Sequence, residues 1–259
     1  MRSSNPMTPT GKSTPRPKAS FAKHHTESPL WPKVDADLKE KIGRLPRNPK
    51  LTKLALLYAE GLQDEFPEAT CALNYSNPLE LLVATILSAQ CTDERVNQVT
   101  PALFARYKTA EEYAAAPEGE LETLVKSTGF FNSKAKSIRM ACGDIAQRFG
   151  GKVPEAIEDL LTLRGVARKT ANVVRIHCFG YPGLTVDTHF KRLSARMGLT
   201  EQTDPEKIEQ EIANLLPPER WTHFSNSIIL HGRKTCKARK PDCHGCRFAS
   251  LCPSALIET

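Results

Sequence analysis

From about residue 50 onward, hydrophobic residues recur with the three- and four-residue spacing of amphipathic helices. The densest apolar stretch follows Asn77-Pro78, a cap and a first-turn proline that favour a helix start. That helix is apolar nearly all round, so we expect it at the centre of the core. Neither an alternating strand pattern nor a repeat of fixed period is evident. The predicted fold class is all-α.

Capping residues predict further helix boundaries. Besides Asn77-Pro78, the predicted starts are Thr100-Pro101, Thr109 with Glu112, Asn132 and Asp204-Pro205. We expect the helix capped by Asn132 to end at Gly150-Gly151, because glycine favours the left-handed conformation after a helix. The faces expected to be buried are Ala135, Ile138, Ala141, Ile145 and Phe149 in that helix, and Ile208, Ile212 and Leu215 after Asp204.

Charge is distributed unevenly along the chain. Residues 1–50 hold 11 Lys/Arg and 4 Asp/Glu, whereas residues 51–259 hold 25 of each, so the net charge of +7 lies in the first segment. Within the neutral remainder, residues 164–196 carry seven basic residues against Asp187, and residues 233–247 carry six against Asp242. Two basic stretches on a neutral body suit a phosphate backbone, although solvated surface charge explains them equally well.

The N-terminal segment, residues 1–48, is rich in Pro, Ser, Thr and Lys and lacks hydrophobic periodicity. We expect it to form a disordered basic arm. Added affinity for nucleic acid, a targeting role and simple solubilisation are equally consistent with this composition.

The chain shows no sign of a membrane span or a secretory signal. Its densest apolar run, residues 79–91, is too short to cross a bilayer and contains Glu80. Four of the eight cysteines lie scattered among apolar residues, where they are expected to act as small core side chains: Cys71, Cys91, Cys142 and Cys178. We therefore expect a reducing compartment, with the protein in the cytoplasm.

The other four cysteines, Cys236, Cys243, Cys246 and Cys252, cluster near the C-terminus and include one Cys-x-x-Cys pair. Four thiolates this close can converge on a metal centre, and thiolates select zinc or iron–sulfur. Zinc sites more often pair two short Cys-x-x-Cys hairpins, but the residues alone leave both choices open.

A helical hairpin is predicted around Gly165, which lies between two short amphipathic helices over about 155–178. Val166 can fill the space between these helices. The second helix starts near Ala167, and its unpaired N–H groups can bind phosphate without reading sequence. Flanking Arg164 and Arg168 supply positive charge. An ordinary αα-hairpin would show the same pattern.

Lys169 falls in the first turn of that second helix. The positive helix end and the adjacent Arg168 both disfavour the protonated amine, which favours a nucleophile. A lysine that contacts phosphate fits the same position. Asp187 is the single acid in its basic stretch and can cap a helix, face a reacting group, or do both. His189, two residues after it, is a further candidate contact for a phosphate backbone.

Together these motifs resemble endonuclease III, the bifunctional pyrimidine-damage branch of the helix-hairpin-helix DNA glycosylases, over about residues 50–252. The resemblance implies a [4Fe-4S] cluster on the four clustered cysteines, a Schiff-base lysine at Lys169 and the essential aspartate at Asp187. Leu87-Ser88-Ala89-Gln90-Cys91-Thr92-Asp93 resembles the loop whose glutamine fills the gap left by an extruded base. Gly129-Phe130-Phe131-Asn132-Ser133-Lys134-Ala135 resembles the loop that wedges into the duplex.

The sequence departs from the family pattern at three positions. The hairpin of the family usually reads Leu-Pro-Gly-Val-Gly, but here Arg164 replaces the proline and Ala167 the second glycine. We expect the methyl group of Ala167 to loosen phosphate contact slightly and Arg164 to compensate. Phe130 replaces the usual leucine and makes a larger wedge, which can alter the preferred lesions or opposing bases.

The resemblance implies a six-helix barrel over 71–181 and a cluster domain combining 49–70 with 182–259, with damaged double-stranded DNA across the cleft. It implies a monomeric bacterial enzyme, acting at the nucleoid, that removes oxidised or ring-saturated pyrimidines and cuts the strand by β-elimination. We expect the cluster to hold the basic loop at 233–247 rather than take a redox step.

Three alternatives stay open from the sequence. A monofunctional adenine-mismatch glycosylase shares the hairpin, aspartate and cluster but usually lacks the lysine and adds a C-terminal domain. The chain could instead be chiefly an abasic-site lyase, or a non-catalytic DNA-binding module.

Overall fold

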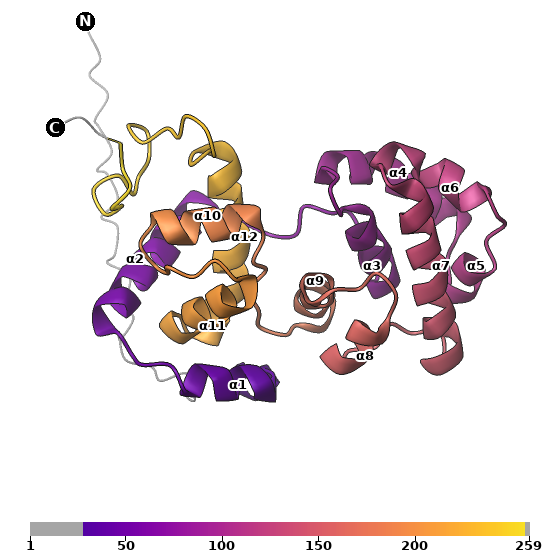
Figure 1. Cartoon of the computed structure of the whole chain (residues 1–259), viewed down its shortest axis with the longest axis horizontal. Helices are drawn as coiled ribbons and strands as arrows, with labels where there is room; N and C mark the ends of the chain where they lie inside the picture. The colour runs from indigo at the N-terminus through magenta and orange to yellow at the C-terminus, as the bar shows by residue number, and fades with distance from the viewer. Residues whose placement is uncertain (1–27, 257–259) are drawn as a thin grey trace, which may run out of the picture.

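The computed structural model describes residues 28–256. In this part of the chain every regular element is a helix and no strand is found, so the all-α prediction is confirmed. The helices form two lobes with separate hydrophobic cores, and α9 (Arg168–Phe179) lies between them (Figure 1). No helix in the described residues is long and apolar enough to cross a membrane.

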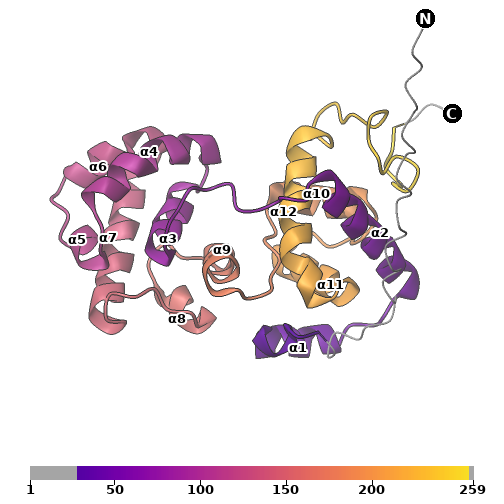
Figure 2. The same cartoon turned by 180° about the vertical axis from the view of Figure 1, so that it is seen from behind.

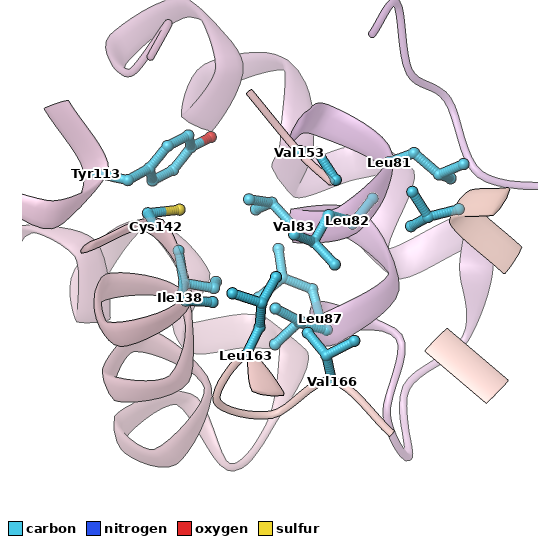
Figure 3. Close-up of a cluster of buried hydrophobic side chains, with 14 of the residues drawn as sticks. Leu81, Leu82, Val83, Leu87, Tyr113, Ile138, Cys142, Val153, Leu163 and Val166 are labelled. Carbon is cyan, nitrogen blue, oxygen red and sulfur yellow. The ribbon is translucent and has the colours of Figure 1, made fainter. Parts of the chain in front are cut away.

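The first lobe has core residues between Leu73 and Val174. Its helices, besides α9, are α3 (Pro78–Leu87), α4 (Asp93–Arg106), α5 (Ala110–Ala114), α6 (Glu120–Val125), η3 (Lys126–Thr128), α7 (Phe131–Arg148) and α8 (Ile157–Thr162). Helix α3 is buried from Leu81 to Leu87, which confirms the central position predicted from its apolar surface. Figure 3 shows α3 side chains within one cluster that also includes Ile138 of α7 and Val166.

The second lobe combines the two ends of the described chain. Its elements are η2 (Trp31–Lys33), α1 (Ala36–Gly43), α2 (Pro49–Glu65), α10 (Thr188–Arg196), α11 (Pro205–Leu215) and α12 (Pro218–Lys234). Helix α2 packs against α12 and α11, and the view from behind shows these three helices together on one side of α9 (Figure 2). The core of this lobe centres on fully buried Trp221, Tyr58 and Phe190.

The prediction of a disordered arm over 1–48 is wrong for residues 28–48. These residues include η2 and α1, and Val34, Leu38 and Ile42 are buried in the second core. The four-residue spacing of these three apolar residues is a helical signal, but the surrounding lysines and prolines obscured it. Residues 1–27 lie outside the described part of the chain.

The predicted helix starts were partly correct. Asn77, Thr109 and Asp204 each cap a helix by accepting a backbone N–H bond, as predicted. The start at Thr100-Pro101 is wrong, because Thr92 caps α4 earlier and Pro101 lies inside that helix. The predicted cap at Asn132 is also wrong, because α7 begins before that residue.

The residue before α7 is Phe130, in the left-handed conformation, so Asn132 lies within the first turn. The buried faces predicted for α7 and α11 are correct. The buried residues are Ala135, Ile138, Ala141, Ile145, Ile208, Ile212 and Leu215, and Phe149 packs on the first core.

Candidate functional site

The hairpin predicted around Gly165 joins α8 to α9. Gly165 has φ +77°, and a Cβ there would lie 2.7 Å from the Cβ of Ser137, so the turn needs glycine for its conformation and its contact with α7. The Val166 side chain is buried in the first core, which leaves only its backbone for a ligand. Arg164 and Ala167 are exposed, and Ala167 caps α9 without a side-chain hydrogen bond. The backbone N–H groups of the α9 N-terminus are therefore free of side-chain caps.

The Arg168 side chain is 26% exposed, and its Nε faces the second lobe. Its Nε is buried without a hydrogen bond and lies 3.6 Å from Oε2 of Glu209 on α11. The amide of Asn172, one turn further along α9, donates to the other oxygen of Glu209 at 3.2 Å. Burial raises the pKa of Glu209 to about 7, while Arg168 acts in the opposite direction. This buried group fastens the start of α9 to the second lobe.

Lys169 and Asp187 line one cavity of about 110 Å³ where the two lobes meet. Lys169, Val173 and His177 reach it from one face of α9, since they are spaced by four residues. Burial lowers the pKa of His177. Asp187 also caps α10 by accepting the backbone N–H of Phe190 at 2.8 Å. The capping role and the position beside a cavity thus occur together.

An ion pair lies at the same cavity and was not predicted. Arg233, at the end of α12, donates to Asp93, at the start of α4, at 2.8 Å. Both side chains line the cavity together with Ser88 and Asn226. In the sequence, Asp93 belongs only to a loop motif and Arg233 only to a basic stretch. Because 140 positions separate them, no local pattern could pair them.

Gln90 and Phe130 lie on two loops of the first lobe and are both exposed, Phe130 by 68%. Both have positive φ, 51° and 47°, which is uncommon outside glycine and carries strain. Rigid surrounding structure must hold such residues, and protruding strained side chains often belong to functional loops.

His189 lies on α10, half-buried, with its Nδ1 3.3 Å from a guanidinium nitrogen of Arg192. The same nitrogen of Arg192 donates to the carbonyl groups of Gly232 and Cys236. His189 thus contacts an arginine that ties α10 to the end of α12 and to Cys236.

The four clustered cysteines lie on the loop after α12. Arg196 donates to Sγ of Cys236 at 3.3 Å, and Nε2 of buried His231 lies 3.5 Å from Sγ of Cys246. Burial raises the pKa of the Cys246 and Cys252 thiols, and the neighbouring cysteines raise it further. In the described residues, no three His, Cys, Asp or Glu side chains surround one point as ligands of a single ion. The scattered cysteines behave as predicted: Cys142 is buried in the first core, and Cys71, Cys91 and Cys178 pack against it.

Comparison with known proteins identifies the family. Residues 83–218, which include the hairpin, Lys169 and Asp187, match the HhH-GPD superfamily of base excision DNA repair proteins. Over 195 residues the chain is 58% identical to endonuclease III of Synechocystis sp., covering 75% of this chain and 89% of that protein. The chain belongs to the endonuclease III family.

Solved structures of endonuclease III share this architecture. A non-covalent endonuclease III–DNA complex matches with a TM-score of 0.76 and 38% identity, over 79% of this chain and 96% of that one. A trapped endonuclease III–DNA covalent intermediate matches equally well, with the same TM-score, identity and coverage.

Proposed function

We propose that this chain is a bifunctional DNA glycosylase and abasic-site lyase that removes oxidised or ring-saturated pyrimidines from duplex DNA. The observation that carries this proposal is the shared cavity of Lys169 and Asp187, a nucleophilic amine and a carboxylate at the starts of two adjacent helices. Membership of the endonuclease III family and the likeness to a covalent endonuclease III–DNA intermediate support it.

The target nucleotide must leave the base stack to reach this cavity. The N–H groups at the start of α9 bind phosphate, with the exposed Arg164 adding charge. Gln90 occupies the vacated space and Phe130 wedges between bases, which their exposed and strained positions favour. His189 and Arg168 remain proposed DNA contacts, and Arg168 also fastens α9 through Glu209.

In the first chemical step the Lys169 amine attacks C1′ of the deoxyribose as the C1′–N bond to the base breaks. Asp187 accepts the proton that leaves the amine and stabilises positive charge on the sugar. Its cap on α10 fixes the carboxylate for this role. The leaving base takes up a proton, and the sugar ring opens to a Schiff base on Lys169.

In the second step the Schiff base acidifies the C2′ proton. A base removes that proton, the C3′–O bond breaks, and the strand is cut 3′ to the lesion by β-elimination. Water then hydrolyses the imine and regenerates Lys169. The same lysine thus serves both steps, which distinguishes this proposal from a monofunctional glycosylase.

The finer proposal for the metal centre is a [4Fe-4S] cluster held by Cys236, Cys243, Cys246 and Cys252. The donor set fits, because four thiolates ligate such a cluster and nitrogen donors from Arg196 and His231 already approach two of the sulfurs. A four-iron cluster takes one thiolate per iron, so its ligands do not surround a single ion. When bound, the cluster supplies a fixed frame for the basic loop at 233–247.

Borohydride trapping tests the lysine assignment. Reduction of the Schiff base on duplex DNA with one ring-saturated pyrimidine should link wild-type protein to DNA, because reduction makes the C–N bond permanent. Lys169→Ala should give no adduct, whereas Lys207→Ala, which alters an exposed lysine on α11, should trap like wild type. Equal trapping by Lys169→Ala would overturn the assignment. A folded wild-type protein that cuts and traps no damaged duplex would overturn the function.

A further inference from the structure

Lys134 is a buried lysine that the chemistry above does not use. It lies in the first turns of α7 and is only 5% exposed. Its amine donates to the carbonyl oxygen of Leu87 at 2.8 Å and to that of Thr128 at 2.7 Å. A lysine is rarely buried unless a specific set of acceptors holds it.

The two acceptors are the last residues of two helices. Leu87 ends α3 and Thr128 ends η3, so their carbonyl groups lie at helix C-termini, where no further turn can bond them. A cation is favoured there because the C-terminal end of a helix is negative. Burial lowers the pKa of Lys134, and nearby Cys91 acts in the opposite direction. One amine therefore ties together two chain segments that lie far apart in the sequence.

Both segments lead directly into the exposed loops of the first lobe. Gln90 closely follows Leu87 in the chain, and Phe130 closely follows Thr128. Gln90 and Phe130 each have a strained left-handed backbone conformation that their surroundings must maintain. Lys134 thus lies at the common base of the two loops and connects them.

We propose that Lys134 is a positioning residue that holds Gln90 and Phe130 at the spacing needed to open and fill the duplex. This inference rests on the proposed function, in which these two side chains occupy the DNA. Lys134 does not touch the reacting atoms, so its loss should impair extrusion of a base from a duplex and leave the lysine chemistry of the cavity intact. A purely stabilising role would affect both equally.

The test compares two substrates of Lys134→Met, which keeps side-chain length but removes the charge and the donors. On duplex DNA with one ring-saturated pyrimidine, kcat/KM should fall at least about tenfold. On a single-stranded oligonucleotide with one abasic site, where no base is extruded and no stack is filled, cleavage should stay within about twofold of wild type. Lys152→Met is the matched control, because Lys152 is exposed beyond the far end of α7 and should leave both rates unchanged.

A double-mutant cycle gives an independent readout. If Lys134 acts through the two loops, Lys134→Met should cause little further loss in a Gln90→Ala/Phe130→Ala background, so the effects will not add. Full additivity would overturn the inference, as would an unchanged duplex rate or an equal fall on both substrates. Should Lys134→Met not fold, Lys134→Gln, which retains a shorter neutral donor, is assayed with the same criteria. Activity of wild type on both substrates keeps this outcome separate from failure of the proposed function.

Discussion

At the scale of single residues, Gly165 is the most constrained position of the hairpin. Gly165→Ala should destabilise the protein in two ways: the left-handed conformation costs an alanine about 1–2 kcal/mol, and the new methyl group overlaps Ser137. Gly119→Ala is a matched control, since Gly119 has φ +84° but no atom within 4 Å of a Cβ. Urea unfolding should show a larger loss for Gly165→Ala, and equal losses would contradict the packing contact.

The residues of the site differ in how far the sequence could predict them. Lys169 and Asp187 were predictable because each lies in a short motif with a recognisable helix start. The contact of Arg168 with Glu209 was not, because Glu209 lies on a separate helix, α11, and only the fold brings the two side chains together. The same holds for Lys134, which the sequence shows only as a basic residue near the start of a predicted helix. Local patterns indicate chemistry, but long-range partners decide where a side chain points.

At the scale of helices, caps with a side-chain acceptor were predicted most reliably. Asn77 and Asp204 were correct because each combines a cap, a first-turn proline and a following apolar face. Thr100-Pro101 shows the same first two signals but lies within α4, since burial of Val96 and Leu103 on one face continues the helix through the proline. Packing outweighed the local signal there, as it commonly does.

Helix α11 carries the clearest dependence on pH. Burial raises the pKa of Glu209 to about 7, so folding favours its protonated form. This contribution to stability is complete below the unfolded pKa of about 4.5 and is lost as pH rises through about 7, a change on the order of 3 kcal/mol. Glu209→Gln has no proton to lose at this position. Its free energy of unfolding, compared with that of wild type, should therefore rise between pH 5 and about 8.

Urea unfolding of both proteins across that pH range measures the difference. Glu201→Gln, at an exposed position before α11, should follow wild type at every pH. A constant difference between Glu209→Gln and wild type would show that Glu209 does not titrate in this window.

At the scale of the whole molecule, the second lobe depends on both ends of the described chain. Composition suggested that everything before residue 49 was a polar arm, because Pro and Lys dominate it on average. Three apolar residues of α1 and the loop before it were enough to build that segment into the core. An average of composition over a window cannot resolve so short an element. The family resemblance could not reveal it either, because that resemblance covered only residues from about 50.

The segment also makes a buried ion pair between the lobes. Both oxygens of Asp35, just before α1, accept from the guanidinium group of Arg175 on α9 at 2.7 Å. The Arg175 side chain is 6% exposed, so Asp35→Ala leaves a buried charge without its partner and should cost about 3 kcal/mol. Asp37→Ala removes an exposed pair with Lys41 from the same helix and should cost less than about 1 kcal/mol. Because Arg175 shares α9 with Lys169, Asp35→Ala should also lower the rate of damaged-duplex cleavage. Urea unfolding measures the loss of stability. Equal urea midpoints for Asp35→Ala and Asp37→Ala would refute the role of the Asp35–Arg175 contact in joining the lobes.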